Sequence, residues 1–347
     1  MDWLGIAISL VKIVVVFSAL MGGVSVMTWV ERRVSAIIQY RWGPNRVGPW
    51  GLLQPIADGI KFIQKEDIVP ASAHKPFYIA APALAVATAL SAFSVIPFGS
   101  EIQVFGRTVK LVILDMDGGI LWGFAATALG VYALVLAGWA SRNKFSLIGG
   151  LRSSAQMISY ELPLALSIAS VVLMAGTLRP TEIVAQQAGW FFHWNIFKGV
   201  PLLGFILFTV AGYAETNRVP FDLPEAEGEL VAGYHTEYSG MRFAAFFMAE
   251  YVNMMTSSAL GITLWLGGWQ LGFPVPLTGV PLVILQVLAF VGKLAFFQFL
   301  FVWIRWTLPR FRYDQLMDLG WKGLLPVSLA NLALNGLLVA LGLNVAR

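Results

Sequence analysis

Residues 4–30 read LGIAISLVKIVVVFSALMGGVSVMTWV, and the charged triplet Glu31-Arg32-Arg33 follows at once. This apolar run exceeds the roughly 20 residues that a helix needs to cross a bilayer. It is too long for the apolar region of a secretory signal, no basic residue precedes it, and it ends in charges rather than in small residues. The run therefore predicts a retained transmembrane helix and a membrane protein.

The rest of the chain has the same character. Hydrophobic residues make up 58% of the 347 and charged residues only 12%, whereas a soluble domain carries about 25% charged residues. Seven further apolar stretches of near-spanning length lie at 77–97, 119–140, 155–177, 199–214, 243–266, 282–304 and 325–345. We therefore expect an all-α membrane protein of about eight transmembrane helices that forms one polytopic domain over residues 1–347.

The loops between these stretches differ in basic charge. The long loops 31–76, 141–154, 215–242 and 305–324 hold sixteen Lys and Arg residues, whereas the opposite loops and the C-terminal Arg347 hold five. Because Lys and Arg are enriched in cytoplasmic loops, we expect the long loops to be cytoplasmic and both termini to lie outside. The same rule accounts for the net charge of +4 without nucleic acid as a partner.

Two of the loops have predicted structure of their own. Residues 50–65 place apolar side chains at helical spacing, which predicts an interfacial amphipathic helix in the first cytoplasmic loop. On the outer side, residues 102–105 and 108–114 are β-prone and flank Gly106, which predicts a small β-hairpin.

The chain contains no cysteine. It can therefore hold neither a cysteine-ligated iron–sulfur cluster nor a disulfide. Its histidines, His74, His193 and His235, do not have the spacing of metal ligands. We expect no metal or cofactor to be bound by this chain, so any redox centre would belong to a partner subunit.

Two glutamates lie within predicted spans, where a carboxylate costs about 2.5 to 3.5 kcal/mol. Glu161 lies eight residues past Ser153, and Glu250 lies eight residues past Arg242. Both positions are then ~12 Å inside the cytoplasmic face. Glu215 closes the fifth span at the same face. Carboxylates at matched depth can pass protons to one another, so these acids indicate a proton path.

The loop after Glu215 is acidic for a cytoplasmic loop. Its acids are Asp222, Glu225, Glu227, Glu229 and Glu237, set against Arg218 and Arg242. Two interpretations stay open. Asp222-Leu223-Pro224-Glu225 fits a capping box at a helix N-terminus, which is a structural role. Alternatively, the loop extends the proton path from Glu161 and Glu250.

The first cytoplasmic loop mixes basic and aromatic side chains. Residues 39–51 read QYRWGPNRVGPWG, and arginines around a Gly/Pro-rich turn fit simple anchoring at the membrane surface. Alternatively, this segment and the amphipathic helix that carries Asp58 and Lys61 line a pocket for a lipid-soluble ligand with a polar head.

Three residues inside the spans also need an explanation. Lys12 lies near the outer end of its span and fits snorkelling to the interface. Lys293 lies near the middle of the seventh span, where a functional and a structural role are both open. Pro163, two residues after Glu161, is expected to perturb its helix and to free a backbone carbonyl near that carboxylate.

Long motifs in the cytoplasmic loops resemble one known family. They are RWGPNRVGPWG at 41–51, LLQP at 52–55, DGIK at 58–61, SSAQMISYE at 153–161, AETNRVPFDLPEAEGELVAGYHTEYSG at 214–240, MAEY at 248–251, WIR at 303–305 and PRFRYDQL at 309–316. Over residues 31–317 the chain resembles the quinone-site (H-type) membrane subunit of proton-pumping NADH:quinone oxidoreductase, respiratory complex I. Motifs of this length are specific.

The resemblance implies roles for many residues. It assigns Arg32, Arg41, Asp58 and Lys61 to the quinone path. It assigns Glu161, Glu215, Asp222, Glu225, Glu227, Glu229, Glu237 and Glu250 to an acidic proton channel that leads from that path. It also implies quinone as substrate and partner subunits that hold NADH, FMN and the iron–sulfur clusters. The length of the chain and its dense Trp and Arg usage favour a bacterial version, so we expect a bacterial inner membrane. Antiporter-like subunits would do the pumping, and part of the bundle would repeat their fold.

Two other functions compete with this one. A membrane subunit of an energy-converting hydrogenase or formate hydrogenlyase shares the scaffold but need not reduce quinone. An independent proton or ion transporter would use the intramembrane charges alone. The intact first-loop and acidic-loop motifs favour the quinone enzyme, and the long cytoplasmic loops suit docking to other subunits better than lone transport.

Overall fold

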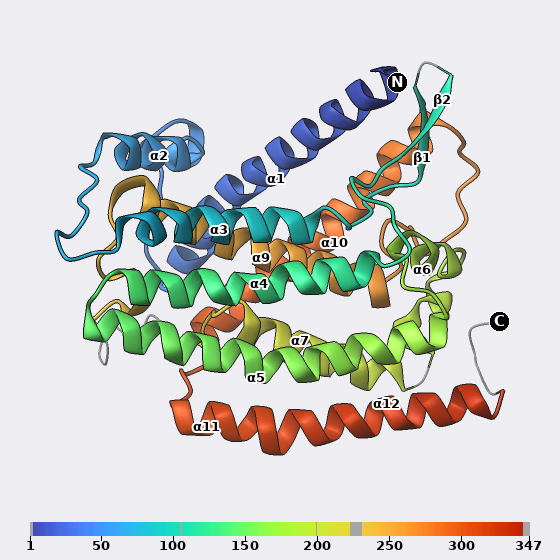
Figure 1. Ribbon diagram of the computed structural model, residues 1–347. Helices are drawn as coiled ribbons and strands as arrows, with labels where there is room; N and C mark the ends of the chain where they lie inside the picture. Colours follow the sequence, from blue (N-terminus) through green and yellow to red (C-terminus); the bar gives the residue numbers. More distant parts are fainter. Residues whose placement is uncertain (1–2, 105, 199, 223–230, 343–347) are drawn as a thin grey trace.

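A computed structural model describes residues 3–104, 106–198, 200–222 and 231–342 of the chain. Long helices lie side by side and make up most of it (Figure 1). They are α1 (Trp3–Ile38), α3 (Lys75–Phe93), α4 (Gly119–Ala140), α5 (Lys144–Ala175), α7 (Pro201–Glu215), α9 (Gly240–Trp265), α10 (Val280–Thr307) and α12 (Leu325–Ala340). The shorter helices are α2 (Gln54–Gln64), α6 (Pro180–Gln186) and α11 (Tyr313–Asp318), and a π-helical turn, η5 (Leu319–Leu324), joins α11 to α12.

The expected all-α membrane architecture is confirmed. Each of the eight expected spans falls on one of the long helices. Within the part of the chain that the structure describes, six helices are long and apolar enough to cross a membrane, with α11 to α12 taken as one helix. The other two expected spans are α7, which is apolar but has only 15 residues, and α9, which is 26 residues long and carries Arg242 and Glu250.

Some of the expected helix ends are wrong. Helix α1 does not stop at Val30 but continues to Ile38, so Glu31 lies inside the helix rather than in a loop. Helix α5 begins at Lys144, well before the expected start at residue 155, and it continues through Pro163 to Ala175. The sequence pattern ends a span at the first charges, whereas Glu31 and Arg32 stay within α1 because α9, α10 and α2 supply their partners.

Small residues bring the central helices close together. Helix α4 lies between α3 and α5 (Figure 1), and a Cβ added at Gly138 of α4 would lie 2.6 Å from the Ser146 carbonyl oxygen of α5. On α3, Ala81, Ala85 and Ala89 are buried. In lipid, where the hydrophobic effect does not drive helices together, close backbone packing of this kind holds a bundle.

The predicted elements outside the bundle are also present. Strands β1 (Glu101–Val104) and β2 (Arg107–Lys110) form an antiparallel hairpin in which Glu101 faces Lys110. Gly106 has φ +75°, a conformation that glycine adopts without steric cost. The expected amphipathic helix corresponds to α2, which packs on α1 and α9 and exposes Ile56 and Ile60. Helix α2 lies at the end of the bundle opposite the hairpin (Figure 1).

Candidate functional site

A cavity of about 530 Å³ lies between α1, α2 and α9. Apolar side chains form much of its wall, among them Phe62, Phe243 and Phe247. Charged side chains and a tyrosine line it as well and can form hydrogen bonds to a polar head: Glu31, Arg32, Arg41, Asp58, Arg218, Tyr251 and Arg305. A cavity of this size with a few convergent polar groups suits an apolar molecule that has a polar end.

Three of the four residues expected on the quinone path line this cavity. Arg32 Nη1 lies 2.5 Å from Asp58 Oδ2, which ties α1 to α2, and Gln54 donates a 2.9 Å hydrogen bond to the other Asp58 oxygen. Arg41 lines the cavity from the first loop. Lys61 does not line it, because its side chain is 73% exposed and reaches Asp58 only at 3.8 Å from outside the cavity.

A buried charge cluster closes one side of the cavity and is centred on Glu31. The Tyr251 hydroxyl donates a 2.6 Å hydrogen bond to Glu31 Oε2, and the Arg305 guanidinium donates to Glu31 Oε1. Arg218 Nη1 lies 3.6 Å from the same oxygen. Four elements distant in the sequence therefore meet at one carboxylate.

Arg218 extends the cluster to a second carboxylate. Its Nε lies 2.6 Å from Glu250 Oε1, and its guanidinium stacks 4.4 Å from the centroid of the Tyr251 ring. Burial alone would lower the pKa of Arg218, but Glu250, Tyr251 and Glu31 raise it, so this arginine stays charged. Arg218 is thus a fixed positive charge between Glu31, which lines the large cavity, and Glu250.

Beyond Glu250 lie two small internal cavities of about 40 Å³ each. We call the one that is lined by both Glu250 and Glu215 the first small cavity. The second small cavity is lined by Glu215 together with Thr127, Thr256 and Ser257. Residues Met157, Glu215, Thr216 and Asn253 line both cavities. Each is roomy enough for water by the usual measure of about 10–15 Å³.

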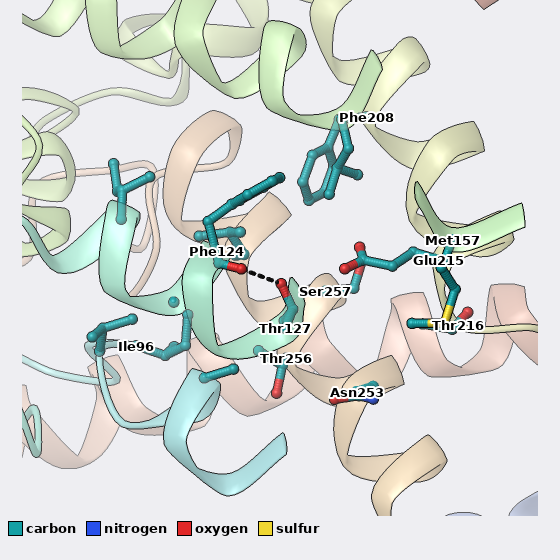
Figure 2. Close-up of a pocket in the computed structure, with 16 residues that line it drawn as sticks. Ile96, Phe124, Thr127, Met157, Phe208, Glu215, Thr216, Asn253, Thr256 and Ser257 are labelled. Carbon is teal, nitrogen blue, oxygen red and sulfur yellow. Dashed lines mark hydrogen bonds between the residues drawn. The ribbon is translucent and has the colours of Figure 1, made fainter. Parts of the chain in front are cut away.

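The second small cavity is shown in Figure 2. The Glu215 carboxylate reaches from the end of α7 toward Thr127 of α4 and Ser257 of α9. Thr127 lies within hydrogen-bonding reach of Glu215, and Glu161 of α5 is close enough to act on Glu215 electrostatically. The structure therefore groups Glu161, Glu215 and Glu250, the three acids expected within or at the end of spans.

The other expected acids lie elsewhere. Asp222 Oδ2 pairs with Arg310 Nη2 at 2.8 Å, and Glu237 Oε1 accepts a 2.6 Å hydrogen bond from Asn143 at the turn between α4 and α5. Neither lines the cavities above. Glu225, Glu227 and Glu229 lie outside the described residues, as does most of the capping box expected at 222–225.

Sequence reasoning does not single out four members of the cluster: Glu31, Arg218, Tyr251 and Arg305. The pattern of charges places Glu31 in a loop, and Arg218 and Arg305 count there only as cytoplasmic positive charge. One signal is available for Arg218. It is one of just two basic residues in an acidic loop, so several carboxylates compete for it as a partner.

A buried histidine lies near this site. His235 packs against Phe243 and Phe247, which line the large cavity, and it is 7% exposed. Burial lowers the pKa of His235 to about 4, and Asp222 opposes this only in part. Because the pKa is lower in the folded chain than in the unfolded one, folding is favoured above the unfolded value of about 6.5 and loses stability as the pH falls from there toward 4.

A pH-dependent loss of stability is therefore expected. Between pH 7.5 and 5, protonation of the unfolded histidine should cost the native chain about 2 kcal/mol. His235→Phe, which keeps an aromatic ring among aromatic neighbours, should remove this part of the pH dependence. The measurement is the temperature at which half of this chain is lost from the purified membrane complex, determined at pH 7.5 and pH 5 for the wild type and for His235→Phe. Equal pH dependence in the two proteins would contradict it.

Comparison with known proteins adds a decisive observation. The family model described as NADH dehydrogenase matches this chain over residues 11–336. The chain belongs to this family. One relative is an H-type NADH-quinone oxidoreductase subunit of Koribacter versatilis, which is 49% identical over 344 residues that cover 96% of this chain and 97% of the relative.

Other members of the family match over nearly the whole chain as well. An H-type NADH-quinone oxidoreductase subunit of Solibacter usitatus is 48% identical, covering 96% of this chain and 97% of its own length. NADH-quinone oxidoreductase subunit 8 of Rhodothermus marinus is also 48% identical, with coverage of 94% and 95%. The resemblance seen in the loop motifs is therefore confirmed, and the hydrogenase alternative is not favoured.

Proposed function

We propose that this chain is the membrane subunit of a proton-translocating NADH:quinone oxidoreductase that forms much of the quinone chamber. Relatives that match this chain over nearly their whole length are named as subunits of NADH-quinone oxidoreductase. The proposed chamber is the cavity between α1, α2 and α9. In this proposal, Phe62, Phe243 and Phe247 contact the apolar part of the quinone, and the charged side chains face its head group.

One observation carries the coupling part of the proposal. Arg218 contacts Glu31, which lines the large cavity, and Glu250, which lines the first small cavity. Reduction of quinone to quinol takes up two electrons and two protons, so it changes the charge at the head group or at the acids beside it. Two unit charges 4 Å apart interact by about 4 kcal/mol at an effective dielectric constant of 20. A change of one charge at Glu31 therefore alters its interaction with Arg218 by several kcal/mol, and in this proposal Arg218, which also contacts Glu250, passes the change on to the acids beyond it.

The proton path then runs from Glu250 to Glu215 and Glu161. Glu250 and Glu215 line the water-sized cavities, Glu161 acts electrostatically on Glu215, and the hydroxyl groups of Thr127, Thr256 and Ser257 line the second cavity beyond. The described residues contain no group of His, Cys, Asp or Glu side chains that could hold a metal ion. Electrons in this proposal come from an iron–sulfur cluster of a neighbouring subunit, while NADH and FMN bind elsewhere in the assembly.

The proposal also includes the setting of the chain. It lies in a bacterial inner membrane with both termini outside and its long loops toward the electron-transfer subunits, and antiporter-like subunits receive the signal from the acidic path. The excess of basic residues in the long loops supports this orientation. The exposed aromatic side chains of the first loop, Tyr40, Trp42 and Trp50, support docking there.

Photolabelling of the native complex tests the chamber. A quinone analogue with a photoreactive group should label peptides from residues 32–65 and from the α9 segment 241–251, because both line the cavity. A competing quinone-site inhibitor should block this labelling. Label confined to neighbouring subunits would remove the chamber from this chain and leave it as a docking or proton-conducting subunit.

A further inference from the structure

Lys293, near the middle of α10, is held by three backbone carbonyls. Its Nζ donates to Leu266 O at 2.7 Å, to Gly268 O at 2.9 Å and to Gln270 O at 2.7 Å. An ammonium group has three hydrogens to donate, so each one has an acceptor. On a further side, Nζ lies 4.3 Å from the centroid of the Trp194 ring. Three carbonyl oxygens and an aromatic face surround the ammonium much as they would surround a small free cation.

These carbonyls belong to the end of α9 and to the turn that follows it. The last carbonyls of a helix have no partner within the helix, and in lipid each unsatisfied group costs several kcal/mol. Side chains from other segments also donate hydrogen bonds to the carbonyls that precede these. Asn195 donates to Leu264 O at 2.7 Å, and the fully buried Gln187 donates to Thr263 O at 3.0 Å. Lys293 completes this set of caps.

The turn after α9 packs closely against Trp194 and Val184. Gly267 and Gly268 both have positive φ, at +70° and +52°. A Cβ on Gly267 would lie 2.5 Å from Trp194 Nε1, and one on Gly268 would lie 2.5 Å from a Val184 methyl carbon. The positive φ values and the lack of space both require glycine here. The carbonyls are thus fixed around the lysine by the backbone.

We propose that the turn after α9 is a cation cradle, built from the carbonyls of residues 266, 268 and 270 and the face of Trp194, in which Lys293 is the resident cation. Three acceptors suit the ammonium form, because a neutral amine would turn its lone pair toward a carbonyl oxygen. Lys293 is then a fixed charge that anchors α9 and does not carry protons. It is a positioning residue, since α9 also carries Glu250 and Tyr251.

This cradle predicts chemical rescue. Lys293→Ala removes three carbons and the ammonium, so n-propylammonium matches the deleted part. In the purified complex, the rate at which heating releases this chain should rise about tenfold or more in Lys293→Ala, because three charge-assisted hydrogen bonds are lost. Added n-propylammonium chloride should reverse most of that rise in a saturable way. Propan-1-ol, which has the same shape without the charge, and sodium chloride should not.

Lys12→Ala is the matched control. Lys12 is the other lysine within a span, and its side chain is partly exposed near Asp115 rather than enclosed by carbonyls. Lys12→Ala should show neither the faster release on heating nor an effect of n-propylammonium on the release rate. Trp194→Leu keeps Lys293 but removes the aromatic face, and it should raise the release rate about threefold, which provides a readout if Lys293→Ala does not assemble.

Several results would overturn the cradle. One is an unchanged release rate in Lys293→Ala. Another is a rise in the release rate that propan-1-ol reverses as well as n-propylammonium does, and a third is a rise that n-propylammonium does not reverse. Release of the chain on heating does not depend on quinone reduction or pumping, so this test stands apart from the proposed function. The consequence for coupling, that a loosened α9 lowers the number of protons pumped per electron, does rest on that function.

Discussion

Replacing Arg218 by methionine is expected to lower NADH:quinone reduction about 100-fold or more. Methionine keeps much of the side-chain volume but leaves Glu31 and Glu250 without the charge that lies between them. Removing one partner of a buried ion pair typically costs about 3–5 kcal/mol. The loss should affect quinone reduction, because the cluster that lines the cavity is disrupted, while NADH oxidation by ferricyanide at the peripheral subunits should persist.

Arg312→Met provides the control for this change. Arg312 pairs with Asp314 on the surface, and its side chain is 77% exposed. Exposed pairs contribute about 0–1 kcal/mol, so quinone reduction should stay near the wild-type rate. If Arg218→Met reduced quinone as fast as Arg312→Met does, the cluster would have no part in the reaction.

Replacing Glu215 by glutamine should stop coupled proton movement while the proposed quinone cavity between α1, α2 and α9 stays intact. Glutamine is close in size but cannot take up and release a proton, and Glu215 is the acid that lines both small cavities. Proton transfer by a positioned group typically contributes about 10²–10⁴-fold to a rate, so we expect coupled turnover to fall about 100-fold. Glu250→Gln should have a similar effect because Glu250 lines one of these cavities, and so should Glu161→Gln because Glu161 acts electrostatically on Glu215.

Glu237→Gln is the control that distinguishes loss of this proton path from a general effect of removing an acidic side chain. Glu237 belongs to the same acidic loop, but its carboxylate binds Asn143 and lines neither small cavity. Pumping is measured as the pH change outside proteoliposomes for each NADH oxidised. Glu237→Gln should pump nearly normally. Unchanged pumping in both Glu161→Gln and Glu250→Gln would reject the path, and a strong loss in Glu237→Gln would show that it runs through the loop instead.

The sequence predicts the helices well because lipid imposes a simple condition. Each span must be apolar for about 20 residues, and the eight expected spans all appear as helices. The amphipathic α2 and the outer hairpin follow from local periodicity in the same way. Of the expected quinone-path residues, Arg32 and Asp58 meet because α1 and α2 pack together.

The centre of the site could not be predicted in this way. Glu31 and Tyr251 are 220 positions apart, and nothing local to Glu31 shows that α9 and α10 supply its partners. Charges after an apolar run normally end a span, so the pattern assigns Glu31 to a loop. The converse holds for Glu237, which is close to the other acids in the sequence although its carboxylate binds Asn143 at the turn between α4 and α5. Its assignment to the proton path stays a prediction.

The length of α1 relates the site to the thickness of the membrane. At 1.5 Å per residue its 36 residues extend about 54 Å, whereas the hydrocarbon core of a bilayer is about 30 Å thick. The helix must therefore tilt or project beyond the core, and in Figure 1 it lies at an angle to α3, α4 and α5. A change in bilayer thickness alters the hydrophobic match of such a helix, and tilting is one way to accommodate that change. Because Glu31 and Arg32 are on this same helix, bilayers of different thickness would present the cavity with slightly different positions of its charged wall.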